Sequence, residues 1–197
     1  MSLLFFCSIC FLMPIHADAA KKAVKARRAY AQMLAAPTLD WGDREYPTDS
    51  MKFFCGDMNG DKVPELVVQY DSAYGYEGIQ RVYTYYKGKV VRVFMTGNCQ
   101  AITRYYPKKK VFVESGGRMG WSLTRYCKLK GKRVTVVAQI QEPDSYMALS
   151  YGTVYRIKNK KVTKAVFKKK VRSLTGKGKG KKVKLRLNTV ENRRKWI

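Results

Sequence analysis

From residue 53 onward, hydrophobic and polar positions alternate in short runs, which is the pattern of half-buried β-strands. The runs are rich in aromatic and β-branched residues, and basic turns join them. We predict four hairpins in which an aromatic-rich strand, a basic turn and a Val-rich strand follow one another. They cover residues 82–94, 103–115, 122–140 and 152–167, turning at Lys87-Gly88-Lys89, Pro107-Lys108, Lys130-Gly131-Lys132 and Asn159-Lys160.

The uneven spacing of these hairpins argues against a strictly periodic propeller. It predicts a mainly β, single-domain antiparallel meander that curls on itself as a barrel, a sandwich or a partial propeller. After a mobile basic loop and one last strand within residues 174–188, we expect a short C-terminal helix. Asn188 would cap that helix, with Glu191 in capping-box position, and Trp196 and Ile197 would pin it to the body.

The pattern changes to a helical one in residues 20–36, which predict an N-terminal helix ending at Pro37. The hydrophobic positions form one narrow stripe, and Lys21, Lys25 and Arg28 lie opposite. The stripe consists of Ala23, Ala26, Tyr30, Met33 and Leu34. We expect this stripe to dock on the domain, although a basic amphipathic helix can also make peripheral contact with an anionic membrane.

Residues 3–15 are almost wholly apolar but shorter than the ~20 residues that span a bilayer. The small residues of Ala17-Asp18-Ala19 follow, so we predict a signal peptide over residues 1–19 and a secreted or cell-wall-associated protein. The remaining regions are the helix of residues 20–36 and a β-rich domain of residues 37–197 with a basic C-terminal third. Because His16 would leave with the signal peptide, histidine-dependent triads and metal sites are excluded from the mature chain.

Three cysteines would remain in the mature chain: Cys55, Cys99 and Cys127. An oxidising compartment permits a disulfide, and an odd number leaves one thiol free. We expect Cys99 to pair with Cys127, because both lie in the same run of hairpins.

The chain carries 40 Lys and Arg against 14 Asp and Glu, a formal net charge of +26. Such a field attracts polyanions and is screened by salt. The partner expected outside a cell is an anionic polymer, such as teichoic acid or an acidic glycan. Residues 156–186 contain no acid and could bind nucleic acid, but no nucleic-acid fold motif is present and secretion disfavours that partner.

The stretch "CGDMNGDKVPELVV", residues 55–68, places oxygen-bearing side chains at alternate positions of a tight turn. Hard cations such as Ca²⁺ take six to eight oxygen ligands, so we predict a calcium loop there. Its ligands would be Asp57, Asn59, Asp61, the carbonyl of Val63 and Glu65, at positions one, three, five, seven and nine. The alternative is a polar turn in which Asp57 and Asn59 accept hydrogen bonds from nearby backbone amides.

The pattern from Asp57 to Leu66 resembles the D-x-N/D-G-D-G-x-x-D/E-L loops of FG-GAP-type β-propeller repeats. The whole chain also resembles uncharacterised secreted proteins of Gram-positive bacteria that carry a single loop of this kind. The resemblance implies a calcium-binding loop that joins two strands. Here the loop occurs once, and Lys62 replaces the usual Gly, which strains the turn if its φ is positive.

Aromatic and basic residues in glycine-flanked stretches are the predicted ligand contacts, because packing demands less of loops. They are Tyr74, Tyr76, Arg118 and Trp121. Tyrosines beside cations can stack on sugars while the cations hold anionic groups.

We therefore predict a non-enzymatic, calcium-stapled binding module held on anionic polymers. One alternative is a glycan hydrolase that works with two carboxylates. Its available acids are Asp71, Glu77, Glu114, Glu142 and Asp144, none of which the spacing pairs. Another alternative is a wall-associated accessory or inhibitor protein.

Overall fold

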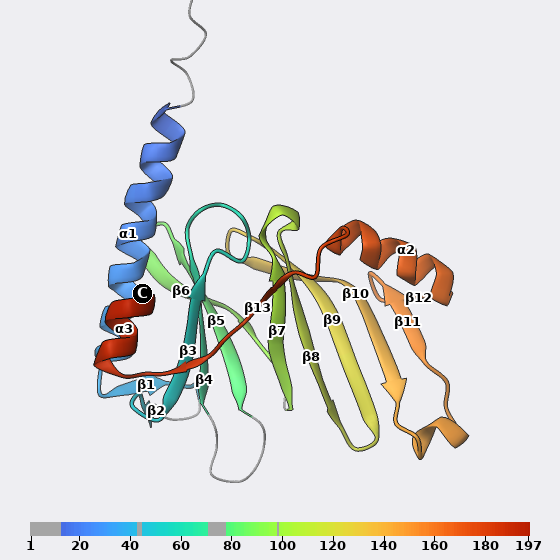
Figure 1. Ribbon diagram of the computed structural model, residues 1–197. Coiled ribbons are helices and arrows are strands. Elements are labelled where there is room, and N and C mark those ends of the chain that lie inside the picture. The colour runs from blue at the N-terminus through green and yellow to red at the C-terminus, as the bar shows by residue number, and fades with distance from the viewer. Residues whose placement is uncertain (1–12, 43–44, 71–77, 98) are drawn as a thin grey trace, which may run out of the picture.

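The computed structural model describes residues 13–42, 45–70, 78–97 and 99–197 (Figure 1). Helix α1 (Met13–Ala35) precedes three antiparallel sheets, and helix α3 (Val190–Trp196) closes the chain. The smallest sheet pairs β1 (Thr38–Asp40) with β2 (Glu45–Pro47). The mainly β architecture with a helix at each end agrees with the prediction from the hydrophobic pattern.

Two larger sheets form the body of the protein. The five-stranded sheet has the order β14-β3-β4-β5-β6, and the seven-stranded sheet has the order β12-β11-β10-β9-β8-β7-β13. The strands of the first are β3 (Met51–Gly56), β4 (Glu65–Tyr70), β5 (Ile79–Tyr86), β6 (Lys89–Met95) and β14 (Arg186–Leu187). Those of the second are β7 (Gln100–Tyr106), β8 (Val111–Arg118), β9 (Trp121–Lys130), β10 (Arg133–Pro143), β11 (Val154–Ile157), β12 (Lys160–Val162) and β13 (Lys181–Lys182).

Both large sheets are open, which corrects the expected curled sheet, barrel or partial propeller. The edge strands of the five-stranded sheet are β14 and β6, and those of the seven-stranded sheet are β12 and β13. The meander is divided instead: the chain leaves the first sheet after β6 and begins the second at β7. A hydrophobic face on each sheet is covered by the other sheet, so closure is not needed to bury it.

Three of the predicted hairpins agree closely with the structure: β5–β6, β7–β8 through the short helix η1 (Pro107–Lys109), and β9–β10. The fourth is shorter than predicted, because β12 ends at Val162 and residues 164–167 belong to helix α2 (Lys164–Thr175). Thr163 caps α2, its Oγ1 accepting from the backbone N–H of Val166 at 3.4 Å. Phe167, Val171 and Leu174 give this helix its apolar face.

The apolar residues form three clusters that define the layers (Figure 1). The first lies between α1 and the outer face of the five-stranded sheet and includes Tyr30 and Phe53. The second lies between the two large sheets and includes Val82 and Phe112. The third lies between α2 and the opposite face of the seven-stranded sheet, around Phe167.

The two large sheets are also joined by a buried amide. The Gln80 side chain, 1% exposed, accepts from the Ile102 backbone N–H at 2.7 Å and donates to Gln69 Oε1 at 2.7 Å. Ile102 is on β7 and Gln69 on β4, so one side chain connects both sheets. Pairing in this way satisfies polar groups that would otherwise be costly to bury.

The stripe predicted on the N-terminal helix faces the core, since Ala26, Tyr30 and Leu34 are fully buried. At the other end, the cap of α3 differs from the prediction: Thr189, and not Asn188, accepts from the N–H of Asn192. Asn188 is buried, and its Nδ2 donates to the carbonyls of Leu34 and Thr48. None of the helices in the described ranges is long and apolar enough to span a membrane.

The expected Cys99–Cys127 disulfide is wrong, because Cys55, Cys99 and Cys127 are all free thiols. Cys127 is buried in the cluster between the sheets, and Cys99 precedes β7. Burial raises the pKa of the Cys55 thiol to about 11 and that of Cys127 to about 12. These two thiols therefore stay protonated and unreactive near neutral pH.

Candidate functional site

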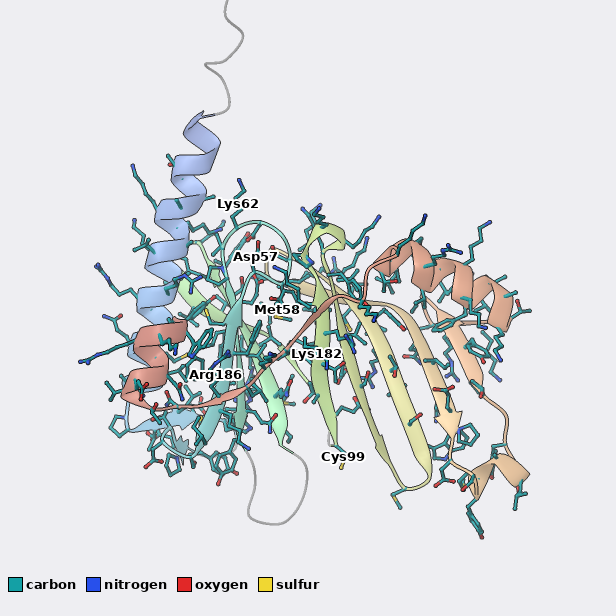
Figure 2. The ribbon with its side chains drawn as sticks, viewed as in Figure 1. Asp57, Met58, Lys62, Cys99, Lys182 and Arg186 are labelled. Atoms are coloured by element: carbon teal, nitrogen blue, oxygen red, sulfur yellow. The ribbon has the colours of Figure 1, made fainter. Side chains whose placement is uncertain are left out.

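The predicted calcium loop connects β3 to β4, as the resemblance implied (Figure 2). Its polar side chains accept hydrogen bonds from the loop's own backbone. Asp57 accepts from the N–H groups of Gly60 at 2.6 Å and Lys62 at 3.0 Å. Asn59 accepts from Asp61, and Asp61 from Val63, both at 2.9 Å. Lys62 has a φ of 69°, so the backbone strain expected at this position is present.

Glu65 holds the loop through hydrogen bonds to its carboxyl group. Its carboxyl group is fully buried and accepts from the Met58 N–H at 2.9 Å and from Asn59 Nδ2 at 2.8 Å. Burial raises the Glu65 pKa to about 8, although the Met58 N–H opposes the shift. Thr84 Oγ1, on β5, lies 3.4 Å from the same carboxyl group. The first residue of β4 therefore holds the loop to its neighbours through side-chain hydrogen bonds.

The oxygen donors of this loop suit the chemistry of Ca²⁺, but they point to separate backbone amides. Throughout the part of the chain that the structure describes, no three His, Cys, Asp or Glu side chains gather as a metal-binding group. A carboxylate oxygen has two lone pairs, so Asp57 and Asp61 retain acceptor capacity beyond these bonds. Calcium binding by Asp57, Asn59, Asp61, Val63 and Glu65 stays a prediction.

Of the four predicted ligand contacts, Tyr74 and Tyr76 lie outside the described residues. Arg118 and Trp121 are Cα partners across the two-residue turn between β8 and β9. Met119 and Gly120 form that turn with φ values of 52° and 80°, as a type I′ hairpin requires. The stretch expected to be a loop is therefore mostly strand, and Trp121 lines a hollow on the sheet.

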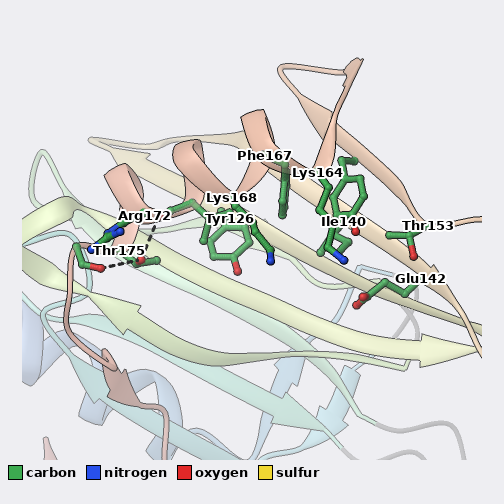
Figure 3. A pocket seen from close by; sticks show the side chains of 12 residues that line it. Tyr126, Ile140, Glu142, Thr153, Lys164, Phe167, Lys168, Arg172 and Thr175 are labelled. Carbon is green, nitrogen blue, oxygen red and sulfur yellow. Dashed lines mark hydrogen bonds between the residues drawn. The ribbon is translucent and has the colours of Figure 1, made fainter.

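A larger groove, of about 510 Å³, runs between α2 and the seven-stranded sheet (Figure 3). Three exposed cations one helical turn apart, Lys164, Lys168 and Arg172, line its helix side. Tyr126, Ile140, Tyr155 and Phe167 provide aromatic and apolar walls, and Glu142 lies at the groove as well. The groove therefore combines positive charge with ring faces.

The segment after α2 continues this positive charge across the molecule. Residues 177–187, which we call the cationic strap, pair with β7 through β13 and with β3 through β14 (Figure 2). Val183 and Leu185 pack against the cluster between the sheets. The strap's lysines are exposed: Lys177, Lys179, Lys181, Lys182 and Lys184. Near the strap's end, the Arg186 guanidinium lies 3.5 Å from the centre of the Trp196 ring, so strap and α3 are held together.

Sequence reasoning missed α2, and with it the groove. The signals were present: Thr163 as a cap, Phe167, Val171 and Leu174 at helical spacing, and Gly176 at the end. The hydrophobic pattern predicted the second strand of a hairpin up to residue 167 instead.

The acids considered for hydrolysis have separate structural partners. Glu114 is buried and accepts from Arg125 Nη1 at 3.2 Å. Asp144 accepts from the Met147 N–H at the start of the short helix η2 (Met147–Leu149). Glu142 lies at the α2 groove, while Asp71 and Glu77 lie outside the described residues.

Comparisons with protein-family models, with curated proteins and with solved structures found no match to this chain. The resemblance of the Asp57 loop to FG-GAP repeats therefore stays a prediction. The function of the protein has to be inferred from its side chains and their arrangement.

Proposed function

We propose that this protein is a non-enzymatic binding module of the cell exterior that holds anionic polymers along its C-terminal basic segment. The observation that carries the proposal is a run of exposed cations along one chain segment, here called the basic track. It consists of the α2 cations Lys164, Lys168 and Arg172 and the lysines of the cationic strap. Because β13 and β14 pair with both sheets, the backbone that carries these lysines has a fixed path across the molecule.

A linear polyanion matches this track better than a small ion does. The track's cations are exposed and spread along a chain segment, with no acid between residues 156 and 186. A polymer gains from many weak, screened contacts at once, and tyrosines in the groove add ring faces for sugar units. Teichoic acids and acidic glycans have this chemistry and belong to the compartment that the signal peptide predicts.

The test compares two double variants that remove equal charge. Lys168→Gln/Arg172→Gln changes the groove, while Lys21→Gln/Lys22→Gln changes exposed positions of α1 on the other side of the molecule (Figure 1). Binding of purified teichoic acid and of a fluorescent heparin oligosaccharide would be measured by anisotropy between about 50 and 500 mM NaCl. We expect binding that weakens steeply with salt, and a larger loss in the groove variant. Equal losses would show that net charge alone is responsible and would overturn the site.

The proposal includes the Asp57 loop as a calcium staple that stiffens the β3–β4 connection. Calorimetric titration of calcium into chelated protein, with a parallel thermal melt, tests it. We expect saturable binding and a higher Tm, both lost in Asp57→Ala and retained in Asp49→Ala, an exposed acid outside the loop. If neither heat nor a Tm shift appears, the loop is held by its own hydrogen bonds and calcium leaves the proposal.

A further inference from the structure

A second hollow lies on the face of the seven-stranded sheet opposite α2. It measures about 340 Å³, within the range of small-molecule sites, and Trp121, Arg125, Gln100, Gln139 and Gln141 are among its lining residues. The strand register explains this gathering. Gln141, Leu123, Gly116 and Gln100 are successive partners across β10, β9, β8 and β7, so they share one row on one face.

A glycine beside the hollow allows two backbone segments to approach closely. At Gly116 an added Cβ would lie 1.8 Å from the Cys99 carbonyl oxygen and 2.7 Å from Gln100 Cα. Only glycine fits so close to the neighbouring backbone. The next residue, Gly117, also has no side chain and lines the hollow. The space between the side chains of Gln100 and Leu123 is therefore not filled by a side chain of these two glycines.

The polar groups around this opening have unused hydrogen-bonding capacity. Gln100 Oε1 is buried and has no hydrogen-bond partner among the described residues, which is rare in folded proteins. The side-chain amides of Gln139 and Gln141 make no hydrogen bond to any described residue. Arg125 uses Nη1 for Glu114, and a guanidinium has five N–H donors in all. The hollow therefore presents both donors and acceptors to a ligand.

The charge of the hollow is nearly balanced. Arg125 is its one charged lining residue among those described, and the buried carboxylate of Glu114 compensates it at 3.2 Å. No lysine of the described ranges lines it, in contrast to the α2 groove. A ligand that depends on ionic attraction would gain little binding energy here. A neutral polyol fits the hollow better, because side-chain amides both donate hydrogen bonds to hydroxyl groups and accept them.

One wall is aromatic. Trp121 is half-buried, and its ring centre lies 5.5 Å from that of Tyr151, which is 55% exposed. The two rings are tilted by 59°, and the Trp121 ring lines the hollow together with the amides. Ring faces beside hydrogen-bonding amides suit a pyranose, which has an apolar face and a hydroxylated edge.

We propose that this hollow binds one unit of a neutral saccharide, with Trp121 against the ring face and the glutamine amides on its hydroxyl groups. The proposal does not depend on the basic track, which lies on other elements. It predicts a site whose affinity is insensitive to salt, because the contacts are stacking and hydrogen bonds between neutral groups.

The experiment presents four neutral trisaccharides to the full chain: maltotriose, cellotriose, mannotriose and tri-N-acetylglucosamine. Saturation-transfer NMR detects binding, and calorimetry gives Kd at about 50 and 500 mM NaCl. We expect at least one trisaccharide to bind with the same Kd at both salt concentrations. Trp121→Ala should raise Kd about tenfold, and Gln141→Leu about fivefold, as expected for one lost hydrogen bond.

Control variants separate the site from general effects. Gln32→Leu makes the same chemical change on an exposed face of α1 and should leave Kd unchanged. Circular dichroism would confirm that each variant is folded. The proposal is overturned if none of the four trisaccharides binds, if binding disappears at high salt, or if folded Trp121→Ala and Gln141→Leu variants bind as the parent does.

Discussion

Strands β9 and β10 build two surfaces of opposite character on the two faces of one sheet. Trp121, Arg125 and Gln139 face the neutral hollow, while Tyr126 and Ile140 face the α2 groove. Successive side chains of a strand point to opposite faces, so neighbouring residues serve different surfaces. The net charge of the whole chain therefore does not determine the chemistry of each part of its surface.

The two surfaces also differ in how their charges are arranged. The groove's cations are exposed on a helix, with screened interactions that suit a mobile polymer. Among the described lining residues, Arg125 is the one cation of the hollow and is held against a buried acid, while the other polar side chains are neutral amides. Substitutions can test this contrast. The largest effects on stability are expected from those that change the Glu114–Arg125 pair beside the hollow.

The largest effect is expected from Arg125→Met. It removes the cationic partner of Glu114, whose side chain is 1% exposed, and leaves the buried acid with the Gly97 N–H, at 3.2 Å, as its remaining hydrogen-bond donor among the described residues. Breaking a buried pair in this way costs about 3–5 kcal/mol. Urea unfolding at pH 7 would measure the loss. The double variant Glu114→Gln/Arg125→Met should recover much of it, and a double variant as unstable as the single one would contradict the role of the buried charge.

The same pair predicts a pH dependence. Burial raises the pKa of Glu114, and Arg125 opposes the shift without cancelling it. The folded state therefore binds a proton more tightly than the unfolded chain, whose glutamate pKa is about 4.3. Stability from this group is full below that value and falls as the pH rises through the folded pKa. Urea unfolding from pH 4 to 8 should show a steeper fall in Arg125→Met and a shallower one in Glu114→Gln.

The next effect is expected from Gly116→Ala, which inserts a methyl group where β8 lies against the backbone of Cys99 and Gln100. Since the atoms in its way are backbone atoms of Cys99 and Gln100, the strands must separate. Overpacking of this kind costs about 1–3 kcal/mol, and the saccharide site should close. Gly152→Ala is the matched control, because its added methyl group meets nothing within 4 Å. Thermal melts of both variants would measure the loss of stability. Equal Tm values for Gly116→Ala and Gly152→Ala would contradict the close backbone approach at Gly116.

The sequence predicted the hairpins well because their signals are local. Turn residues and alternation define β5–β6 and β9–β10, and the apolar stripe of α1 faces the core as its spacing indicated. The division into two facing sheets could not be read from these signals. It depends on contacts between distant strands, such as the Gln80 amide that joins β4 to β7.

The candidate sites were only partly predictable for the same reason. Arg118 and Trp121 stood out because glycines flank them, and Trp121 does line a hollow. The glutamines did not stand out, since a half-buried Gln on a strand has no distinctive sequence pattern. They come together only through the strand register, which places residues 100 and 141 in one row across four strands.

A smaller effect is expected from Thr163→Ala at the start of α2. The Thr163 hydroxyl caps the helix, and loss of such a cap costs about 1 kcal/mol. Because α2 carries the groove's cations, polyanion binding should weaken while saccharide binding is retained. Hydrogen exchange of the α2 amides would report the loosening. Thr163→Ser keeps the hydroxyl and should behave as the parent; equal loosening in both variants would exclude capping as the cause.

The smallest expected effects are the cross terms between the two surfaces, and they are the sharpest test of the comparison. Lys168→Gln/Arg172→Gln should leave trisaccharide Kd unchanged, and Gln141→Leu should leave heparin affinity unchanged. Independent sites without shared partners have additive free energies, to within about 0.3–0.5 kcal/mol. Calorimetry with each ligand, in the presence and absence of the other, would measure the coupling directly. A coupling clearly above that range would mean that the sheet between them transmits binding and that the two faces form one site.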